Sequence, residues 1–149
     1  AARSLRGRRR EAALRGEPFR FPVRVYYEDT DAAGVVYYAN YLKYMERART
    51  EWLEAAGHPL AAFEREHGIV FVVHRCEIDD RRPARLNDML EVTVEVEDAG
   101  GSRFIAGQRV ERGGEVLTAA RVTLACVDTL RWRPVRIPAS LLQRLESIT

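Results

Sequence analysis

Hydrophobic and polar residues alternate after residue 18. One face of this stretch takes Phe19, Phe21, Val23, Val25 and Tyr27, and the other takes Arg20, Arg24 and Glu28. A period of two predicts a half-buried strand over residues 19–27. Pro22 lacks the N–H group that a ladder needs, so this strand is predicted to lie at an edge or to start the sheet.

The period changes after the segment D-T-D-A-A-G. Apolar residues then recur at spacings of three and four, at Tyr41, Tyr44, Met45, Ala48, Trp52, Leu53 and Ala56. This spacing predicts a helix of about four to five turns, with Asn40 as N-cap and Gly57 as the stop. Two shorter helices are predicted over residues 60–66 and 138–148.

The stretch between the two short helices has the pattern of β-structure. Four strands are predicted, over residues 69–79, 89–98, 103–111 and 115–128. Gly100-Gly101 and Gly113-Gly114 are placed as hairpin turns, so three or four sequential strands should form an antiparallel meander. Strand 115–128 is apolar on both faces and is predicted to be central.

These elements predict an α+β fold in which one antiparallel sheet packs on one long helix. Such a fold leaves the other face of the sheet partly apolar, which predicts burial against a second subunit.

Length and composition indicate one domain over residues 19–149 after a basic segment, 1–18. The chain is 46% hydrophobic, and no apolar run approaches the roughly 20 residues of a membrane-spanning helix. Residues 1–20 carry seven arginines against two glutamates, a local charge of +5, and the rest of the chain sums to −3. The segment is interpreted as a solvated, partly disordered and flexible extension, with a nucleic-acid arm, a membrane-surface arm or a transit peptide as alternatives.

The two cysteines, Cys76 and Cys126, lie in strand-like sequence without C-x-x-C spacing. They are predicted to be buried free thiols in a reducing compartment, which favours a cytoplasmic protein. The three histidines show no spacing typical of metal ligands, so no metal site is predicted.

The segment between the first strand and the long helix contains two carboxylates, Asp29 and Asp31. A helix start presents unpaired N–H groups and a positive partial charge, and the small residues 32–34 let a substrate approach the backbone. A carboxylate and N–H donors directed at one point suit acyl transfer. The alternative is structural: Asp31 as a cap or Asx-turn residue, and Asp29 as a structural or solvent-facing group.

Three stretches carry a family resemblance: RVYYEDTDAAGVVYYANYLKYMERARTEWL, PARLNDMLEVTVEVED and ACVDTLRWRPVRIP. They resemble the hotdog-fold acyl-CoA thioesterases of the 4-hydroxybenzoyl-CoA thioesterase type, above all the YbgC-like branch associated with the Tol–Pal system. The resemblance covers about residues 19–140. It implies a hotdog fold, an antiparallel sheet of about five strands wrapped on one long central helix.

The same resemblance implies thioester hydrolysis without a metal or cofactor, since the CoA moiety is part of the substrate. It also implies a homodimer or homotetramer in which paired subunits build each active site. Association with the Tol–Pal envelope machinery or with enzymes of fatty-acid and phospholipid metabolism is a further expectation, and nucleic-acid binding is not expected.

By position, the resemblance makes Asp31 the catalytic carboxylate and the Tyr38 backbone N–H the group that polarises the thioester carbonyl. Many relatives carry histidine at position 38, so an imidazole role is absent here, and the tyrosine ring is expected to line the acyl pocket. Glu46 is a candidate second carboxylate, with a helix-surface ion pair to Arg47 or Arg49 as its alternative. The missing histidine keeps open a binding or scaffold protein with little turnover.

Substrate contacts are expected from the loop around Asp31 and from basic residues elsewhere. The loop candidates are Gly34, Val35, Val36 and Tyr37, and the candidates for the CoA phosphates are Arg81, Arg82, Arg85, Ser102 and Arg103. Each of the latter is alternatively an ordinary surface residue.

Overall fold

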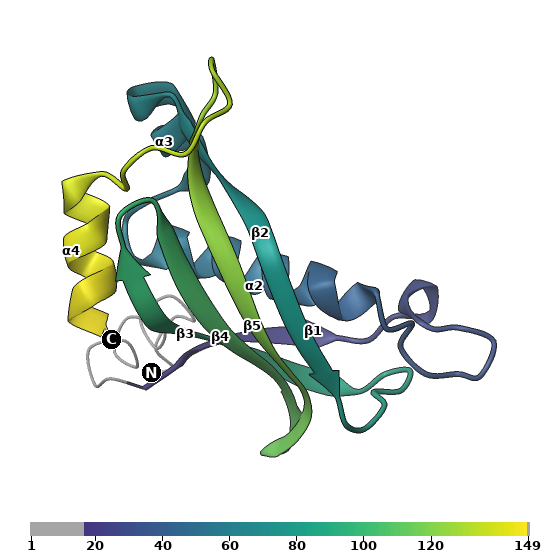
Figure 1. Cartoon of the computed structure of the whole chain (residues 1–149). Helices are drawn as coiled ribbons and strands as arrows, with labels where there is room; N and C mark the ends of the chain where they lie inside the picture. The colour runs from purple at the N-terminus through teal and green to yellow at the C-terminus, as the bar shows by residue number, and fades with distance from the viewer. Residues whose placement is uncertain (1–16, 149) are drawn as a thin grey trace.

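The computed structural model describes residues 17–148, in which one antiparallel sheet wraps around a long helix (Figure 1). The elements are β1 (Phe19–Arg24), η1 (Tyr27–Asp29), α2 (Asn40–Ala55), α3 (Leu60–His67), β2 (Ile69–Asp80), β3 (Met89–Gly100), β4 (Arg103–Arg112), β5 (Glu115–Asp128) and α4 (Ala139–Ile148). The predicted α+β architecture is therefore confirmed. The expectation of a flexible basic extension falls mainly on residues 1–16, which lie outside the described residues.

The order of strands in the sheet is β1-β3-β4-β5-β2, with every neighbouring pair antiparallel. Three strands, β3 to β5, form the predicted meander, whereas β2 crosses to the far edge and pairs with β5. Pro22 lies in the edge strand β1, as predicted. The middle strand is β4, so β5 is an interior strand beside it rather than the central one.

The core forms where α2 packs against the concave side of the sheet. Six α2 side chains at helical spacing are buried, namely Tyr41, Tyr44, Met45, Ala48, Trp52 and Leu53. They share one cluster with Leu90, Val92 and Val94 of β3 and Phe104 of β4. Burial of each large apolar side chain contributes about 1.5–3 kcal/mol, and this anchors the helix that presents the site.

Both short helices form close to their predicted places. The helix predicted over 60–66 extends one residue further and ends at Gly68, whose φ of 64° is the left-handed conformation that glycine adopts readily. The last helix begins one residue later than predicted, and its Leu141 and Leu145 are buried in the core.

Two predictions at the entry to α2 were wrong. The first strand ends at Arg24 instead of residue 27, because the chain turns into η1, and the Tyr27 side chain is 82% exposed. Ala39, not Asn40, is the N-cap. The Asn40 side chain instead donates from Nδ2 to the Asp29 carbonyl oxygen at 2.8 Å, which ties the helix to the preceding loop.

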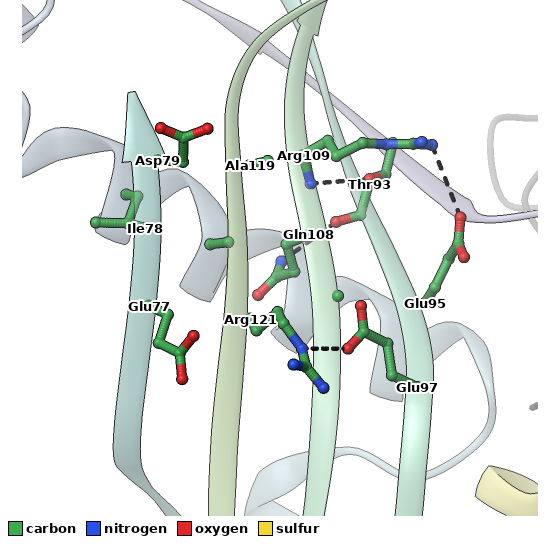
Figure 2. A pocket seen from close by; sticks show the side chains of 12 residues that line it. Glu77, Ile78, Asp79, Thr93, Glu95, Glu97, Gln108, Arg109, Ala119 and Arg121 are labelled. Carbon is green, nitrogen blue, oxygen red and sulfur yellow. Dashed lines mark hydrogen bonds and ion pairs between the residues drawn. The ribbon is translucent and has the colours of Figure 1, made fainter. Parts of the chain in front are cut away.

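The sheet face opposite α2 combines charged and apolar residues, as the prediction of a partly apolar face requires, and its burial against a second subunit stays a prediction. It holds a hollow of about 480 Å³, lined by the charged residues Glu77, Asp79, Glu95, Glu97, Arg109 and Arg121 together with Ile78, Ala119 and Ala120. In Figure 2 the Arg121 side chain meets Glu97, at 2.6 Å, across Gly107. A Cβ at Gly107 would lie 2.6 Å from Glu97 Oε1, so a larger residue would displace this ion pair.

Candidate active site

The chain between η1 and α2 forms a narrow loop that projects from one end of the sheet. Thr30 and Val36 pair across its base, and the Asp31 N–H donates to the Val35 carbonyl at 2.9 Å. Gly34 turns the loop with a φ of 78°, and nothing lies within 4 Å of the place where its Cβ would stand. The backbone here is therefore open to a close approach.

Asp31 is exposed in this loop. Its side chain forms an Asx turn, which was the structural alternative to a catalytic role in the sequence analysis. Its Oδ1 accepts a hydrogen bond from the Ala33 N–H at 2.8 Å. Its Oδ2 has no hydrogen-bond partner within the described part of the chain. The turn orients the carboxylate and leaves one oxygen available for chemistry.

The N–H groups after the loop divide into paired and unpaired donors. The Val36 N–H donates to Ala84 at 2.8 Å, the Tyr37 N–H to Asp29 at 2.9 Å and the Asn40 N–H to Tyr37 at 2.8 Å. Among residues 17–148, the N–H groups of Tyr38 and Ala39 find no acceptor. They precede the first turn of a 16-residue helix, where a developing negative charge is stabilised.

Asp29 fixes this arrangement and is structural, as the sequence analysis allowed. Its Oδ2 accepts the Tyr26 N–H at 2.9 Å, and its carbonyl oxygen accepts both the Tyr37 N–H and the Asn40 side chain.

Burial, together with the nearby Asp29 carboxylate, raises the pKa of the Tyr44 hydroxyl, which has no hydrogen-bond partner in the described chain. The bond from the Asn40 side chain to the Asp29 carbonyl could not be predicted from the sequence, because no local pattern indicates a contact between residues 11 positions apart.

A pocket of about 260 Å³ lies beside Tyr38. Its lining consists of Val36, Tyr38, Tyr41, Asp80, Arg81, Arg82 and Pro83. The backbone N–H groups of Arg81 and Arg82 both donate to the Leu117 carbonyl, at 2.8 and 3.1 Å. These bonds hold the loop between β2 and β3, residues 81–88, against β5. Two of the predicted phosphate-binding residues are thereby brought next to Tyr38.

Of the loop candidates 34–37, Val36 is the one among the lining residues of this pocket. Val35 pairs with Arg85, and the Arg85 N–H donates to Asp88 Oδ2 at 2.9 Å. The rings of Tyr37 and Tyr38 are exposed, with centroids 4.9 Å apart, and the neighbouring Tyr38 hydroxyl raises the pKa of Tyr37. Val36 is buried, so it supports the loop from the core side.

Glu46 lies exposed on α2, two turns after Tyr38. It forms no ion pair with Arg47 or Arg49 in the part of the chain that the structure describes. Arg49 instead donates to Gln108 Oε1 at 2.8 Å, and burial lowers the pKa of this arginine while the charge of Glu46 counteracts the effect.

Ser102 lies in the turn between β3 and β4, and Arg103 is the first residue of β4, so both are away from the other candidates. This turn follows β3, whereas the loop of Arg81, Arg82 and Arg85 precedes it. A strand of 12 residues spans about 40 Å. One chain therefore does not bring Ser102 and Arg103 to Tyr38.

The cysteines differ from each other. Cys126 is buried, and burial raises its pKa to about 11. Cys76, on the edge strand β2, is exposed, so the prediction of a buried Cys76 was wrong. Residues 17–148 contain no group of three or more His, Cys, Asp or Glu side chains that could hold a metal ion. In the same range, no helix has the length and apolar character needed to cross a membrane.

Comparison with known proteins places these features in a family context. The model of the thioesterase-like superfamily matches residues 25–145. The chain is 45% identical over 120 residues to the acyl-CoA thioesterase YbgC of Haemophilus influenzae, covering 80% of this chain and 88% of that protein. It is 43% identical over 124 residues to the acyl-CoA thioester hydrolase YbgC of Escherichia coli, covering 83% and 92% of the two chains.

Solved structures agree in fold. The crystal structure of a probable thioesterase from Bartonella henselae matches with a TM-score of 0.76 at 33% identity, over 81% of this chain and 99% of that one. The 1,4-dihydroxy-2-naphthoyl-CoA thioesterase of Synechocystis, at 23% identity and a TM-score of 0.79, shares the fold over 86% of this chain and 95% of that one.

Proposed function

The chain belongs to the thioesterase-like superfamily and is an acyl-CoA thioester hydrolase of the hotdog fold, and we propose that Asp31 and the Tyr38 N–H carry its reaction. One observation supports this assignment above the others. The Tyr38 N–H is an unpaired donor at the start of the central helix, and it follows a loop that displays a carboxylate with one unengaged oxygen.

Two routes use these groups. In the nucleophilic route, Asp31 attacks the thioester carbonyl carbon, the C–S bond breaks, and the CoA thiolate leaves and takes a proton. Water then hydrolyses the anhydride to the free acid and restores the carboxylate. In the general-base route, Asp31 takes a proton from the attacking water and passes it to the departing sulfur.

In both routes the thioester oxygen becomes an oxyanion, which the Tyr38 N–H and the helix N-terminus stabilise. Positioned acid–base chemistry contributes about 10²–10⁴-fold to a rate, and one oxyanion donor about 10²–10³-fold. Thioester hydrolysis consumes only water, so the proposal needs no metal or cofactor. Glu46 remains a candidate second carboxylate further along α2.

Substrate recognition is proposed at the pocket beside Tyr38. Arg81 and Arg82 line it and can form charge-assisted hydrogen bonds to CoA phosphates, with Arg85 next to them. The open backbone at Gly34 and the exposed rings of Tyr37 and Tyr38 suit contact with the thioester and the acyl chain. Ser102 and Arg103 join such a site only if a second copy of the chain supplies them.

We propose a homodimer or homotetramer, which the family resemblance implies and in which Ser102 and Arg103 of a second copy could join the site. No hydrogen bond or ion pair joins Asp31 to Tyr38 among residues 17–148, and in this proposal the thioester carbonyl lies between the two groups, which come from one chain or from two. A cytoplasmic location is a proposal that rests on the spacing of the two cysteines and on the motif resemblance. Association with Tol–Pal components or with enzymes of fatty-acid and phospholipid metabolism is a proposal that rests on the motif resemblance alone.

The test is release of CoA thiol from short aliphatic, long aliphatic and aromatic acyl-CoA thioesters by the purified full chain. We expect turnover of at least one class well above the rate in buffer. Saturable binding of acyl-CoA without thiol release for any class would contradict the proposal and favour the alternative, a binding or scaffold protein.

A further inference from the structure

The turn that follows β5 displays two large apolar side chains to solvent. We call residues 129–133 the Leu-Trp tip. Leu130 is 94% exposed, more than any other large hydrophobic residue in the described chain, and Trp132 is 65% exposed. Figure 1 shows this segment, yellow-green between β5 and α4, rising beyond α3 at the extreme end of the molecule. The active-site loop projects elsewhere, so the tip is separate from the proposed chemistry.

The tip is held by a dense set of hydrogen bonds. Asp128 Oδ1 accepts the N–H groups of Leu130 and Arg131 at 2.7 and 3.2 Å, and the Asp128 carbonyl accepts the Trp132 N–H at 2.8 Å. The Thr129 N–H and hydroxyl both donate to the Gly68 carbonyl at the end of α3, at 2.9 and 3.0 Å. The exposed side chains therefore project from a fixed platform.

Trp132 adopts a φ of 56°, the left-handed conformation that a bulky residue rarely takes. The strain is not offset by burial of the indole in the fold, since that ring is largely in water. Backbone strain of this kind is a feature of functional segments. The arrangement suggests that the indole has a partner outside the chain.

The charged side chains around the tip indicate which class of partner the tip could bind. Arg131, Arg133 and Arg136 are exposed and take part in no ion pair within residues 17–148. The Asp128 carboxylate is engaged by backbone N–H groups. The adjacent helix α3 carries Glu64 and Glu66 as well as Arg65, which weakens the positive field, so apolar contact must supply much of the affinity.

An exposed Leu and Trp flanked by guanidinium groups suit the boundary between water and the hydrocarbon of a lipid bilayer. Trp prefers the interface between water and hydrocarbon, Leu partitions into the hydrocarbon, and Arg binds phosphate in bidentate fashion. We propose that the Leu-Trp tip docks the protein on the phosphate-bearing surface of a phospholipid bilayer. A single tip gives weak, reversible binding, which several copies in one assembly would strengthen.

The experiment uses the full chain and unilamellar vesicles of phosphatidylcholine with or without phosphatidylglycerol. The chain has two tryptophans, and Trp52 is buried in the core, so a blue shift of emission on adding vesicles reports Trp132. We expect this shift together with co-sedimentation, more strongly with phosphatidylglycerol.

The matched variants are Leu130→Ser with Trp132→Ser at the tip, and Tyr27→Ser as a control at another exposed site. Partitioning of the double variant, measured by co-sedimentation, should fall at least about tenfold, with unchanged thioesterase turnover and Tm, whereas the control should bind as the wild type does. The Arg-rich residues 1–16 are present in every variant, so a difference in binding between variants reports the tip. Arg131→Gln with Arg133→Gln should weaken binding a few-fold, chiefly at low salt.

Three results would overturn the proposal. The first is absence of vesicle binding by the wild type at millimolar lipid. The second is equal binding by the wild type and the double tip variant. The third is a change of oligomeric state in the tip variants without any vesicle binding, which would make the tip a contact with another copy or another protein.

Discussion

Asp31 and Asp128 form the same local structure in two different loops. Each carboxylate accepts a hydrogen bond from the backbone N–H two residues further on, at 2.8 Å for Asp31 and 2.7 Å for Asp128. The Asp128 Oδ1 also holds the Arg131 N–H, and these bonds lower the pKa of Asp128. In the described part of the chain, the Asp31 carboxylate receives only one such bond.

The surroundings of the two turns differ more than the turns themselves. Beyond Asp31 the chain leads to a 16-residue helix and to two N–H groups that have no acceptor among residues 17–148. Beyond Asp128 the N–H groups instead hold an exposed Leu and Trp in place. An Asx turn by itself therefore does not separate a catalytic carboxylate from a structural one. The proposed difference between the two carboxylates is whether the neighbouring backbone N–H groups already have hydrogen-bond acceptors.

Apart from loss of the Asp31 carboxylate itself, the largest expected decrease in turnover comes from removing one hydrogen-bond donor, the Tyr38 N–H. Replacing the Tyr38 residue by its α-hydroxy acid analogue converts the N–H into an ester oxygen and keeps the side chain. We expect kcat to fall about 10²–10³-fold, because the oxyanion loses a donor. The same replacement at Leu130 removes an N–H that serves Asp128, and it should lower Tm without changing kcat. Equal kcat for the Tyr38 ester and the wild type would remove this donor from the mechanism.

A smaller effect is expected from the arginines of the pocket. Arg81→Ala and Arg82→Ala should each raise KM for acyl-CoA about 3–10-fold with little change in kcat, because each loses a charge-assisted contact to phosphate. Steady-state kinetics of Arg103→Ala provides the comparison. An unchanged KM there indicates a pocket built by one chain, and an increase indicates that the β3–β4 turn of another copy reaches the site.

The Tyr38 hydroxyl tests whether the side chain shares the role of its backbone. Tyr38→Phe should change kcat less than about threefold, since the proposed donor is the N–H and the ring remains. Thiol-release assays over the acyl-CoA panel measure this directly. A loss approaching that of the Tyr38 ester would transfer the role to the hydroxyl.

The smallest effect on turnover is expected at Asp128, where Asp128→Asn should leave kcat unchanged and lower Tm at pH 7. The folded-state pKa of this group is depressed, so its stabilisation is present above the unfolded pKa of about 3.9 and is lost as pH falls through the folded value. The Tm difference between wild type and variant should therefore shrink below about pH 4. A difference that stays constant down to pH 2 would contradict this account.

The periodicity of the chain was sufficient to predict most of the fold. The alternation of Leu90, Val92 and Val94 with glutamates places β3, and the spacing from Tyr41 to Leu53 places α2, since both patterns reflect which face meets the core. The first strand was predicted to run too far because Asp29 bends the chain through contacts with Tyr37 and Asn40. Long-range bonds of this kind have no local signature.

The outer sheet face shows the same limitation. Strand periodicity identifies the residues of one strand that share a face, but not the charged neighbours that other strands contribute. Arg121 of β5 meets Glu97 of β3 across Gly107 of β4, and only the sheet order brings them together. For the candidate site, sequence reasoning selected the loop and the arginines, whereas the separation of Arg103 from Arg81 depends on the length of β3.

The most direct test of the central claim is the turnover of Asp31→Asn on an acyl-CoA that the wild type hydrolyses. The asparagine side-chain oxygen can still accept the Ala33 N–H, so the Asx turn and the fold should be kept while the carboxylate is lost. The account predicts a decrease in kcat of about 10²–10⁴-fold with an unchanged Tm. A kcat equal to that of the wild type would show that Asp31, like Asp128, is only a turn residue.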